Sequence, residues 1–149
     1  MNCTAPLCFG TRDDQFGKFS SPYSGKLASV KLVHLYGNVT CYKRIPQYWS
    51  YWGCGQYNSS HISIVITDSN NSPIFFPSRE FMLDKSGTYS SIPDYDSLSP
   101  ELVLPALSNP PFVTRGQELR VWYGEDFNKN AKVDDNEGKS CCDIYARFM

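Results

Sequence analysis

The sequence predicts an all-β protein, a β-sandwich stabilised by disulfides. Turn-forming residues recur about every ten positions, and the segments between them are short and rich in β-branched and aromatic side chains. No segment keeps the helical hydrophobic period over a useful length. The chain has 6 cysteines, an even number, as expected of a fold held by disulfides.

The length of 149 residues favours a single domain that is large enough to bury its own core. Residues 1–25 are dense in turn-forming residues, and we expect them to form an irregular arm tethered by a disulfide. Residues 26–149 carry the strand signals. We expect them to form the β-sandwich.

The longest predicted strand covers residues 27–40, where apolar side chains such as Leu32 and Val33 fall on both faces. We therefore expect it to be covered on both sides. The segment 61–67 alternates between isoleucines and polar residues, which predicts a strand with one exposed face. Further strands are predicted at residues 74–76, 80–83, 102–104, 112–114, 119–123 and 140–148.

The cysteines are Cys3, Cys8, Cys41, Cys54, Cys141 and Cys142. The middle pair brackets a loop, and a disulfide between them would staple its two ends. The first pair can close on itself, or both members can reach other elements. The adjacent last pair points to opposite faces of a strand, so both cannot face the core. We expect these two to be tied to different elements, with the N-terminal arm as the most plausible partner.

Charge and composition exclude several classes of function. The net charge is −1 with no basic stripe, so the sequence gives no support for a nucleic-acid partner. No apolar run approaches the roughly 20 residues of a membrane helix, so we expect no membrane insertion. N-glycosylation sequons occur at Asn2, Asn38, Asn58 and Asn70. Together with the cysteines, they predict a secreted, extracellular glycoprotein.

An acidic loop, residues 125–137, lies between two predicted strands. Its oxygen-bearing side chains are those of Glu125, Asp126, Asn128, Asn130, Asp134, Asp135, Asn136 and Glu137. Such a cluster repels itself unless a hard cation or solvent relieves it, and calcium (Ca2+) takes carboxylates, amides and carbonyls as ligands. We therefore predict a calcium site here. The competing interpretation is an ordinary solvated hairpin loop.

The spacing of this loop also matches an EF-hand that begins at Asp126 and ends at Glu137. However, Ala131 stands where that motif needs a glycine. The flanking segments are also predicted strands, whereas an EF-hand needs helices. We therefore set the EF-hand helix pair aside.

An aromatic loop, residues 41–57, is the second unusual stretch. It is punctuated by proline and glycine, and its aromatic residues are Tyr42, Tyr48, Trp49, Tyr51, Trp52 and Tyr57. Large rings with polar edges can cover a core or contact a ligand. Both interpretations stay open, and the same rings can serve both purposes.

Two groups of segments resemble a known family. These are Leu119–Asp126 with Asp135–Ile144, and Val30–Cys41 with the later Trp52-Gly53 step. They resemble the bacterial calcium-dependent galactophilic lectins of the PA-IL type. The same C-terminal residues also resemble uncharacterised cysteine-rich secreted animal proteins with the pattern WYGED…DN.G..C.DVYA. The lectin resemblance implies a jelly-roll or galactose-binding-like sandwich with one calcium ion.

The lectin resemblance also implies a set of site residues. Asp126 would be both a calcium ligand and an acceptor for a sugar hydroxyl, and Asp135 and Asn136 would complete the side-chain ligands. The loop is longer than in the family by about two residues. The implied calcium ligands are Asp126, Asp135, Asn136, the carbonyl of Cys41 or Tyr42, and Asn128, Asn130 or Asp134 in place of a threonine. The implied sugar contacts are Asp126, the backbone of Phe127, Asp135, Asn136, Trp52 and Gln56.

These features together predict a secreted calcium-dependent carbohydrate-binding protein. The sugars would be of the galactose or N-acetylgalactosamine type, and we expect a homo-oligomer because single lectin sites bind weakly. We also expect Asp126→Ala to abolish calcium and sugar binding in a protein that still folds. The alternative is a non-catalytic extracellular adhesion or structural module in which calcium only stabilises the fold.

We do not expect an enzyme. Only 2 histidines are present, and both fall in predicted strands. The sequence contains neither a Gly-x-Ser-x-Gly nor a His-Glu-x-x-His motif. The carboxylates cluster in one loop, whereas a hydrolase needs a pair that flanks a cleft.

Overall fold

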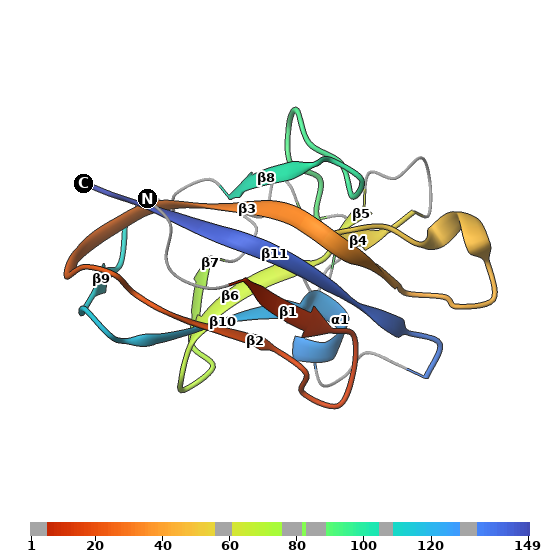
Figure 1. Ribbon diagram of the computed structural model, residues 1–149, viewed down its shortest axis with the longest axis horizontal. Coiled ribbons are helices and arrows are strands. Elements are labelled where there is room, and N and C mark those ends of the chain that lie inside the picture. Colours follow the sequence, from red (N-terminus) through yellow and green to blue (C-terminus); the bar gives the residue numbers. More distant parts are fainter. Residues whose placement is uncertain (1–5, 56–60, 76–81, 83–88, 105–108, 129–133) are drawn as a thin grey trace.

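The computed structural model describes residues 6–55, 61–75, 82, 89–104, 109–128 and 134–149 (Figure 1). These residues form two antiparallel sheets that pack face to face, with one hydrophobic core between them. The predicted disulfide-stabilised β-sandwich is therefore confirmed.

The first sheet is built around the two longest strands, β3 (Gly25–Thr40) and β11 (Glu137–Phe148). They pair antiparallel over nearly their whole length and run side by side along the molecule (Figure 1). The strand order is β1-β11-β3-β8, and β9 pairs with the start of β3. The shorter strands are β1 (Leu7–Gly10), β8 (Glu101–Leu104) and β9 (Phe112–Val113).

The second sheet has the order β2-β10-β6-β7. Its strands are β2 (Gly17–Ser20), β10 (Glu118–Tyr123), β6 (Ile64–Asp68) and β7 (Pro73–Phe75). A small two-stranded sheet pairs β4 (Gly53–Cys54) with β5 (His61–Ile62). The short helices are η1 (Pro46–Tyr48), within the aromatic loop, and α1 (Gly124–Phe127), directly after β10.

The core lies between the inward faces of the two sheets. Leu32 of β3 and Ile144 of β11 meet Ile66 of β6 and Val121 of β10 in one cluster. Each of these side chains is almost completely buried. Complete burial of such a side chain contributes roughly 1.5–3 kcal/mol. The alternating pattern of the strands therefore explains why the sheets close on each other.

Two strands differ from the prediction in the faces that they bury. The outer side of β3 is not covered, because Leu35 and Tyr36 are 42% and 63% exposed. The predicted exposed face of β6 is covered instead, and Thr67 is fully buried. Thr67 accepts a hydrogen bond from the Trp122 indole, which satisfies its buried hydroxyl.

The N-terminal segment is not the irregular arm that the sequence predicted. Its strand β1 pairs with β11 in the first sheet, and β2 pairs with β10 in the second. The turn between them therefore crosses from one sheet to the other. The predicted tether is present, because Cys8 of β1 forms a disulfide with Cys141, which lies directly opposite on β11.

The remaining cysteines divide into one confirmed prediction and one that is wrong. The predicted Cys41–Cys54 disulfide joins the ends of the aromatic loop. Cys142 is a free thiol, because it points into the hydrophobic core while Cys141 beside it faces Cys8. The expected disulfide of Cys142 is therefore wrong. Cys3 lies outside the described residues.

Two of the sequons can be placed. Asn38 is exposed on β3 opposite Lys139, and Asn70 is exposed in the turn between β6 and β7. Asn2 and Asn58 lie outside the described residues. Within the described ranges, no helix is long and apolar enough to cross a membrane.

Candidate functional site

The acidic loop begins at a well-anchored position. Tyr123 at the end of β10 is fully buried, and its hydroxyl donates to the Gly53 carbonyl oxygen at 2.8 Å. The next residue, Gly124, donates its N–H to the Ser63 carbonyl oxygen at 2.9 Å. Burial, and secondarily the charge of Glu125, raises the pKa of Tyr123 well above its ordinary value. The loop therefore leaves the sheet from a fixed point.

Asp126, in helix α1, is only 4% exposed. Its carboxylate oxygens accept hydrogen bonds from the backbone N–H groups of Asp14 at 3.2 Å and Gln15 at 3.1 Å. Asp13 and Asp14 have positive φ angles of 62° and 59°, which turns this backbone toward the carboxylate. Asp126 thus holds the turn between β1 and β2.

Asn136 contacts the same turn from the other end of the acidic loop. It is fully buried, and its Nδ2 donates to the Thr11 carbonyl oxygen at 3.0 Å. Because a carbonyl oxygen only accepts hydrogen bonds, the atom of the Asn136 amide that faces Thr11 must be the nitrogen. The oxygen end, Oδ1, is buried with no hydrogen-bond partner in the described part of the chain. The turn at residues 11–15 therefore brings Asp126 and Asn136 to one place.

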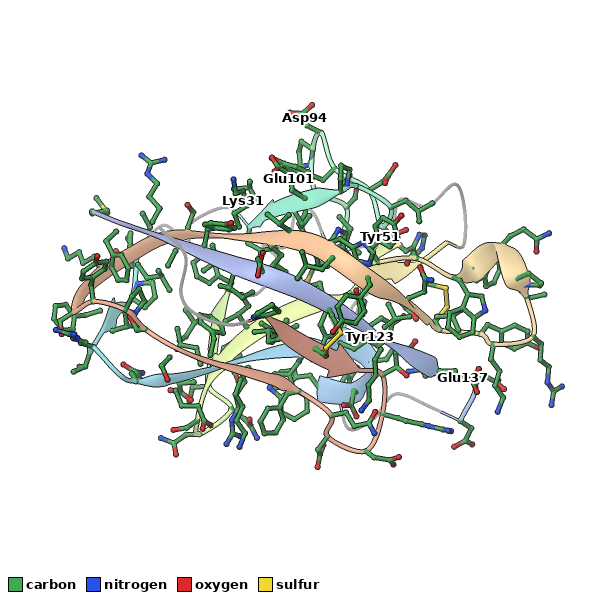
Figure 2. The ribbon with its side chains drawn as sticks, in the orientation of Figure 1. Lys31, Tyr51, Asp94, Glu101, Tyr123 and Glu137 are labelled. Atoms are coloured by element: carbon green, nitrogen blue, oxygen red, sulfur yellow. A yellow bond between two sulfur atoms is a disulfide. The ribbon has the colours of Figure 1, made fainter. Side chains whose placement is uncertain are left out.

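The aromatic loop lies against the end of the acidic loop. Lys43 donates its N–H to the Asp135 carbonyl oxygen at 2.8 Å, and Thr40 pairs with Glu137. The Trp49 ring lies so close to Gly138 that a Cβ atom there would come within 2.7 Å of it. The 41–43 backbone is therefore beside Asp135. Figure 2 labels Glu137 at this end of the sandwich.

A pocket of about 380 Å³ adjoins the two loops and is lined by Cys41, Tyr42, Ile45, Tyr48 and Tyr89. The Tyr89 hydroxyl donates to the Glu125 carboxylate. Glu125 and Asp126 are adjacent in α1 and serve different contacts. Glu125 reaches Tyr89, which lines the pocket, whereas Asp126 reaches the β1–β2 turn.

Several predicted site residues lie elsewhere. Trp52 is fully buried in the core, and its Nε1–H donates to the Ser99 carbonyl oxygen at 2.8 Å. No face of its ring is left for a sugar, so its predicted contact is wrong in this structure. Phe127, whose predicted contact is through its backbone, directly follows Asp126 in α1, and its ring packs edge-on against Trp122 with 5.5 Å between ring centroids. Asp134 is exposed, and Gln56 and Asn130 lie outside the described residues.

The sequence interpretation missed several residues of this region, namely Thr11, Asp14, Gln15, Ile45 and Tyr89. The first three belong to a polar turn that looks like any other turn. Their role depends on contacts with residues more than 100 positions away. The sequence carries no signal for Tyr89 at all.

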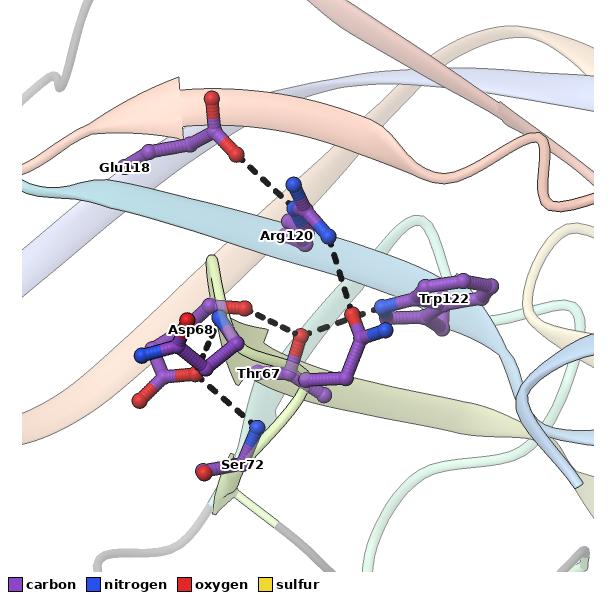
Figure 3. A network of polar contacts seen from close by, with 8 residues as sticks. Thr67, Asp68, Ser72, Glu118, Arg120 and Trp122 are labelled. Atoms are coloured by element: carbon purple, nitrogen blue, oxygen red, sulfur yellow. Dashed lines mark hydrogen bonds and ion pairs between the residues drawn. The ribbon is translucent and has the colours of Figure 1, made fainter.

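A polar network on the second sheet has an internal structural role (Figure 3). Arg120 donates to Glu118 at 2.8 Å and to Asn71 at 3.0 Å. Its guanidinium also lies over the Phe16 ring, 4.2 Å from the centroid. Asp68 accepts from the backbone N–H of Asn70 and Ser72, which closes the β6–β7 turn. These groups satisfy one another, so we do not assign a ligand to them.

The described residues contain no group of three or more His, Cys, Asp or Glu side chains that could hold a metal ion. An amide oxygen such as that of Asn136 and backbone carbonyls lie outside this class of ligands, and calcium accepts both.

Comparisons with known proteins give one strong match. No protein-family model matches the chain, and no curated protein matches it. Among solved structures, the chain is similar to AJLec, a lectin from the sea anemone Anthopleura japonica, with 35% sequence identity and a TM-score of 0.86. The match covers 99% of this chain and 95% of AJLec.

Proposed function

This chain belongs to the lectin family of AJLec, and we propose on that basis that it is a secreted carbohydrate-binding protein whose site is the acidic loop. The observation that carries the proposal is a match over nearly the whole of both chains. At 99% of this chain, the match includes both sheets. Fold similarity alone does not establish function, but a lectin relative of this identity supports glycan binding in general.

We further propose that sugar binding depends on calcium. The buried Oδ1 of Asn136 supports this, because a buried polar atom normally has a partner. Asp126 supports it as well, since its carboxylate lies at the same β1–β2 turn as Asn136 and calcium takes carboxylate oxygens as ligands. The other described candidates are Asp135, Asn128, Asp134 and the carbonyl of Cys41 or Tyr42, and the Lys43 N–H joins the two loops by its bond to the Asp135 carbonyl oxygen.

Calcium, when bound, offers coordination positions that two neighbouring sugar hydroxyls can fill. The protein groups supply the rest of the recognition. Carboxylates such as Asp126 and Asp135 accept hydrogen bonds from sugar hydroxyls, and charge-assisted bonds of this kind are roughly twice as strong as neutral ones. The β1–β2 turn and the aromatic loop fix these groups before binding, which reduces the entropic cost.

The proposed sugars are of the galactose and N-acetylgalactosamine type, as the PA-IL resemblance implies. The two disulfides support an extracellular location, since such bonds persist in oxidising compartments. We propose a homo-oligomer for a physical reason. A single site makes few contacts, and several sites on one particle raise the overall affinity.

A glycan array probed with purified protein in calcium and in chelator tests the proposal. We expect binding to glycans with terminal galactose or N-acetylgalactosamine, loss in chelator and recovery when calcium is restored. Binding that is unaffected by chelator would contradict the proposed calcium dependence, while the proposed carbohydrate binding would stand. If no glycan binds while chelator lowers the melting temperature, the alternative of a calcium-stabilised structural module is correct.

A matched pair of variants locates the site. Asp135→Asn and Asp94→Asn each remove one negative charge with almost no change in size. Asp94 lies in the loop before β8, away from Glu137 (Figure 2). We expect Asp135→Asn to weaken calcium-dependent glycan binding by about tenfold or more, because calcium affinity follows the ligand charge count. Asp94→Asn should bind like the wild type. Equal binding by both variants would contradict this site.

A further inference from the structure

The pocket beside the acidic loop is formed by side chains that do not belong to the core. Tyr42, Ile45, Tyr48 and Tyr89 are all absent from the central hydrophobic cluster and from the aromatic residues packed against it. Two other aromatics of the same loop behave differently, because Trp52 is in the core and Tyr51 packs against it. The two roles considered for the aromatic loop are thus divided between different rings.

The aromatic-loop backbone that carries Tyr42 and Tyr48 is held in place by several contacts. The Cys41–Cys54 disulfide closes the loop, and the Tyr48 carbonyl oxygen accepts from the Gly55 N–H at 2.8 Å. Gly55 packs so tightly that a Cβ atom there would come within 2.3 Å of the Gln47 carbonyl oxygen. The η1 turn adds a bond from the Tyr48 N–H to the Ile45 carbonyl oxygen at 3.0 Å. A rigid aromatic surface outside the core is suited to binding.

The chemistry of the pocket fits a sugar ring. The Tyr42 and Tyr48 rings are tilted by 57° with centroids 6.4 Å apart, so they form two walls at an angle. Tyrosine combines an apolar face with a hydroxyl at its edge, and a pyranose likewise has an apolar C–H face and polar edges. The volume of about 380 Å³ is within the range of small-ligand pockets.

Tyr89 of the pocket and Lys43 beside it contact the acidic loop at two separate points. Tyr89 donates to Glu125 at the start of the loop, and Lys43, next to Tyr42, bonds to Asp135 at its end. A glycan whose terminal sugar is bound by the acidic loop can therefore extend into the pocket. We propose that the Tyr42–Tyr48–Tyr89 pocket is a second saccharide subsite that binds the sugar next to the terminal one. This inference rests on the proposed function.

Calorimetric titration distinguishes the two sites. The ligands are methyl galactoside and the β1,3-, β1,4- and α1,6-linked disaccharides that carry a terminal galactose. We expect the wild type to bind at least one disaccharide about three- to tenfold more tightly than methyl galactoside. One additional aromatic contact contributes a gain in affinity of this size. Tyr48→Ala should remove this advantage and change the affinity for methyl galactoside less than twofold. Tyr48→Phe, which keeps the ring, should retain most of it.

Tyr36→Ala is the matched control, because Tyr36 is an exposed tyrosine on β3 that does not line the pocket. It should leave the disaccharide advantage intact. Ile45→Ala provides a second pocket variant if Tyr48→Ala does not fold. No disaccharide advantage in the wild type, or an advantage that survives both pocket variants, overturns the subsite while the proposed function stands. A wild type that binds none of the sugars overturns both.

Discussion

The Asn136 side chain donates from Nδ2 to the Thr11 carbonyl oxygen at 3.0 Å, while its Oδ1 is buried without a hydrogen-bond partner among the described residues. One end of this amide therefore fixes the β1–β2 turn, and the other end remains available to a ligand. Few side chains among the described residues combine complete burial with an unused acceptor.

Asn136→Ala should remove the stabilisation of the protein by calcium. If calcium binds only the folded wild type, a concentration 100 times the dissociation constant raises its free energy of unfolding by about 2.7 kcal/mol. Thermal melts with and without calcium measure this effect, with magnesium at equal ionic strength as the control. We expect no calcium-dependent shift for Asn136→Ala. A shift equal to that of the wild type would remove Asn136 from the calcium site.

Asp126 should contribute to stability even without calcium. In Asp126→Ala, the N–H groups of Asp14 and Gln15 lose their acceptor, and we expect a loss of about 2–3 kcal/mol in urea unfolding with chelator present. Asp126→Asn keeps one oxygen acceptor and should lose less. The variant is still expected to fold, as predicted from the sequence, but with reduced stability. Equal stability of the two variants would contradict the role of these hydrogen bonds.

The long strands could be predicted from sequence because their signal is local. The segment 27–40 is a long run rich in apolar and β-branched residues and becomes most of β3, and the alternating segment 140–148 becomes most of β11. Strands β1 and β2 have only four residues each and depend on pairing with β11 and β10. A segment of that length has no measurable period. The sequence therefore indicated a turn-rich arm in a region that the structure shows to be part of both sheets.

The candidate site was predictable only in part, for the same reason. The density of oxygen-bearing side chains identified the acidic loop, and adjacency to the aromatic loop came from the resemblance. Burial decides the roles within these loops, and it is a property of the whole fold. Trp52 and Tyr48 are both aromatic residues of one loop, yet the first is in the core and the second lines the pocket.

Gly138 should be required for the contact between the aromatic loop and β11. It has a φ of 99°, and a Cβ atom there would come within 2.2 Å of the Asn38 carbonyl oxygen. Gly116 is a matched control, since its φ is 83° and nothing lies within 4 Å of its Cβ position. Alanine at either position costs about 1–2 kcal/mol for the left-handed backbone.

The clash should add about 1–3 kcal/mol in Gly138→Ala alone. Urea unfolding of both variants gives the difference. The change in tryptophan fluorescence reports whether the Trp49 ring has moved. If Gly116→Ala were as destabilising as Gly138→Ala, backbone strain would explain both effects, and the close packing of Trp49 and Asn38 around Gly138 would have no energetic role.

The free thiol of Cys142 should make the protein less stable in alkali. Burial, and secondarily the charge of Asp143, raises the pKa of this thiol from 9.0 to about 12. As the pH rises through 9, the thiol ionises in the unfolded chain and stays protonated in the folded chain. The unfolded state then binds fewer protons, so the free energy of unfolding falls with rising pH between about 9 and about 12.

The measurement compares urea unfolding of the wild type and Cys142→Ala at pH 7.5–8 and at pH 10. At the lower pH, the variant should be less stable by about 1 kcal/mol because it leaves a small cavity. By pH 10, the wild type should have lost about 1 kcal/mol more than the variant. The raised pKa of Tyr123 acts in the same direction, but it is present in both proteins and cancels in the comparison. Parallel pH profiles for the two proteins would mean that the Cys142 thiol ionises equally in the folded and unfolded chains, which is incompatible with its burial in the core.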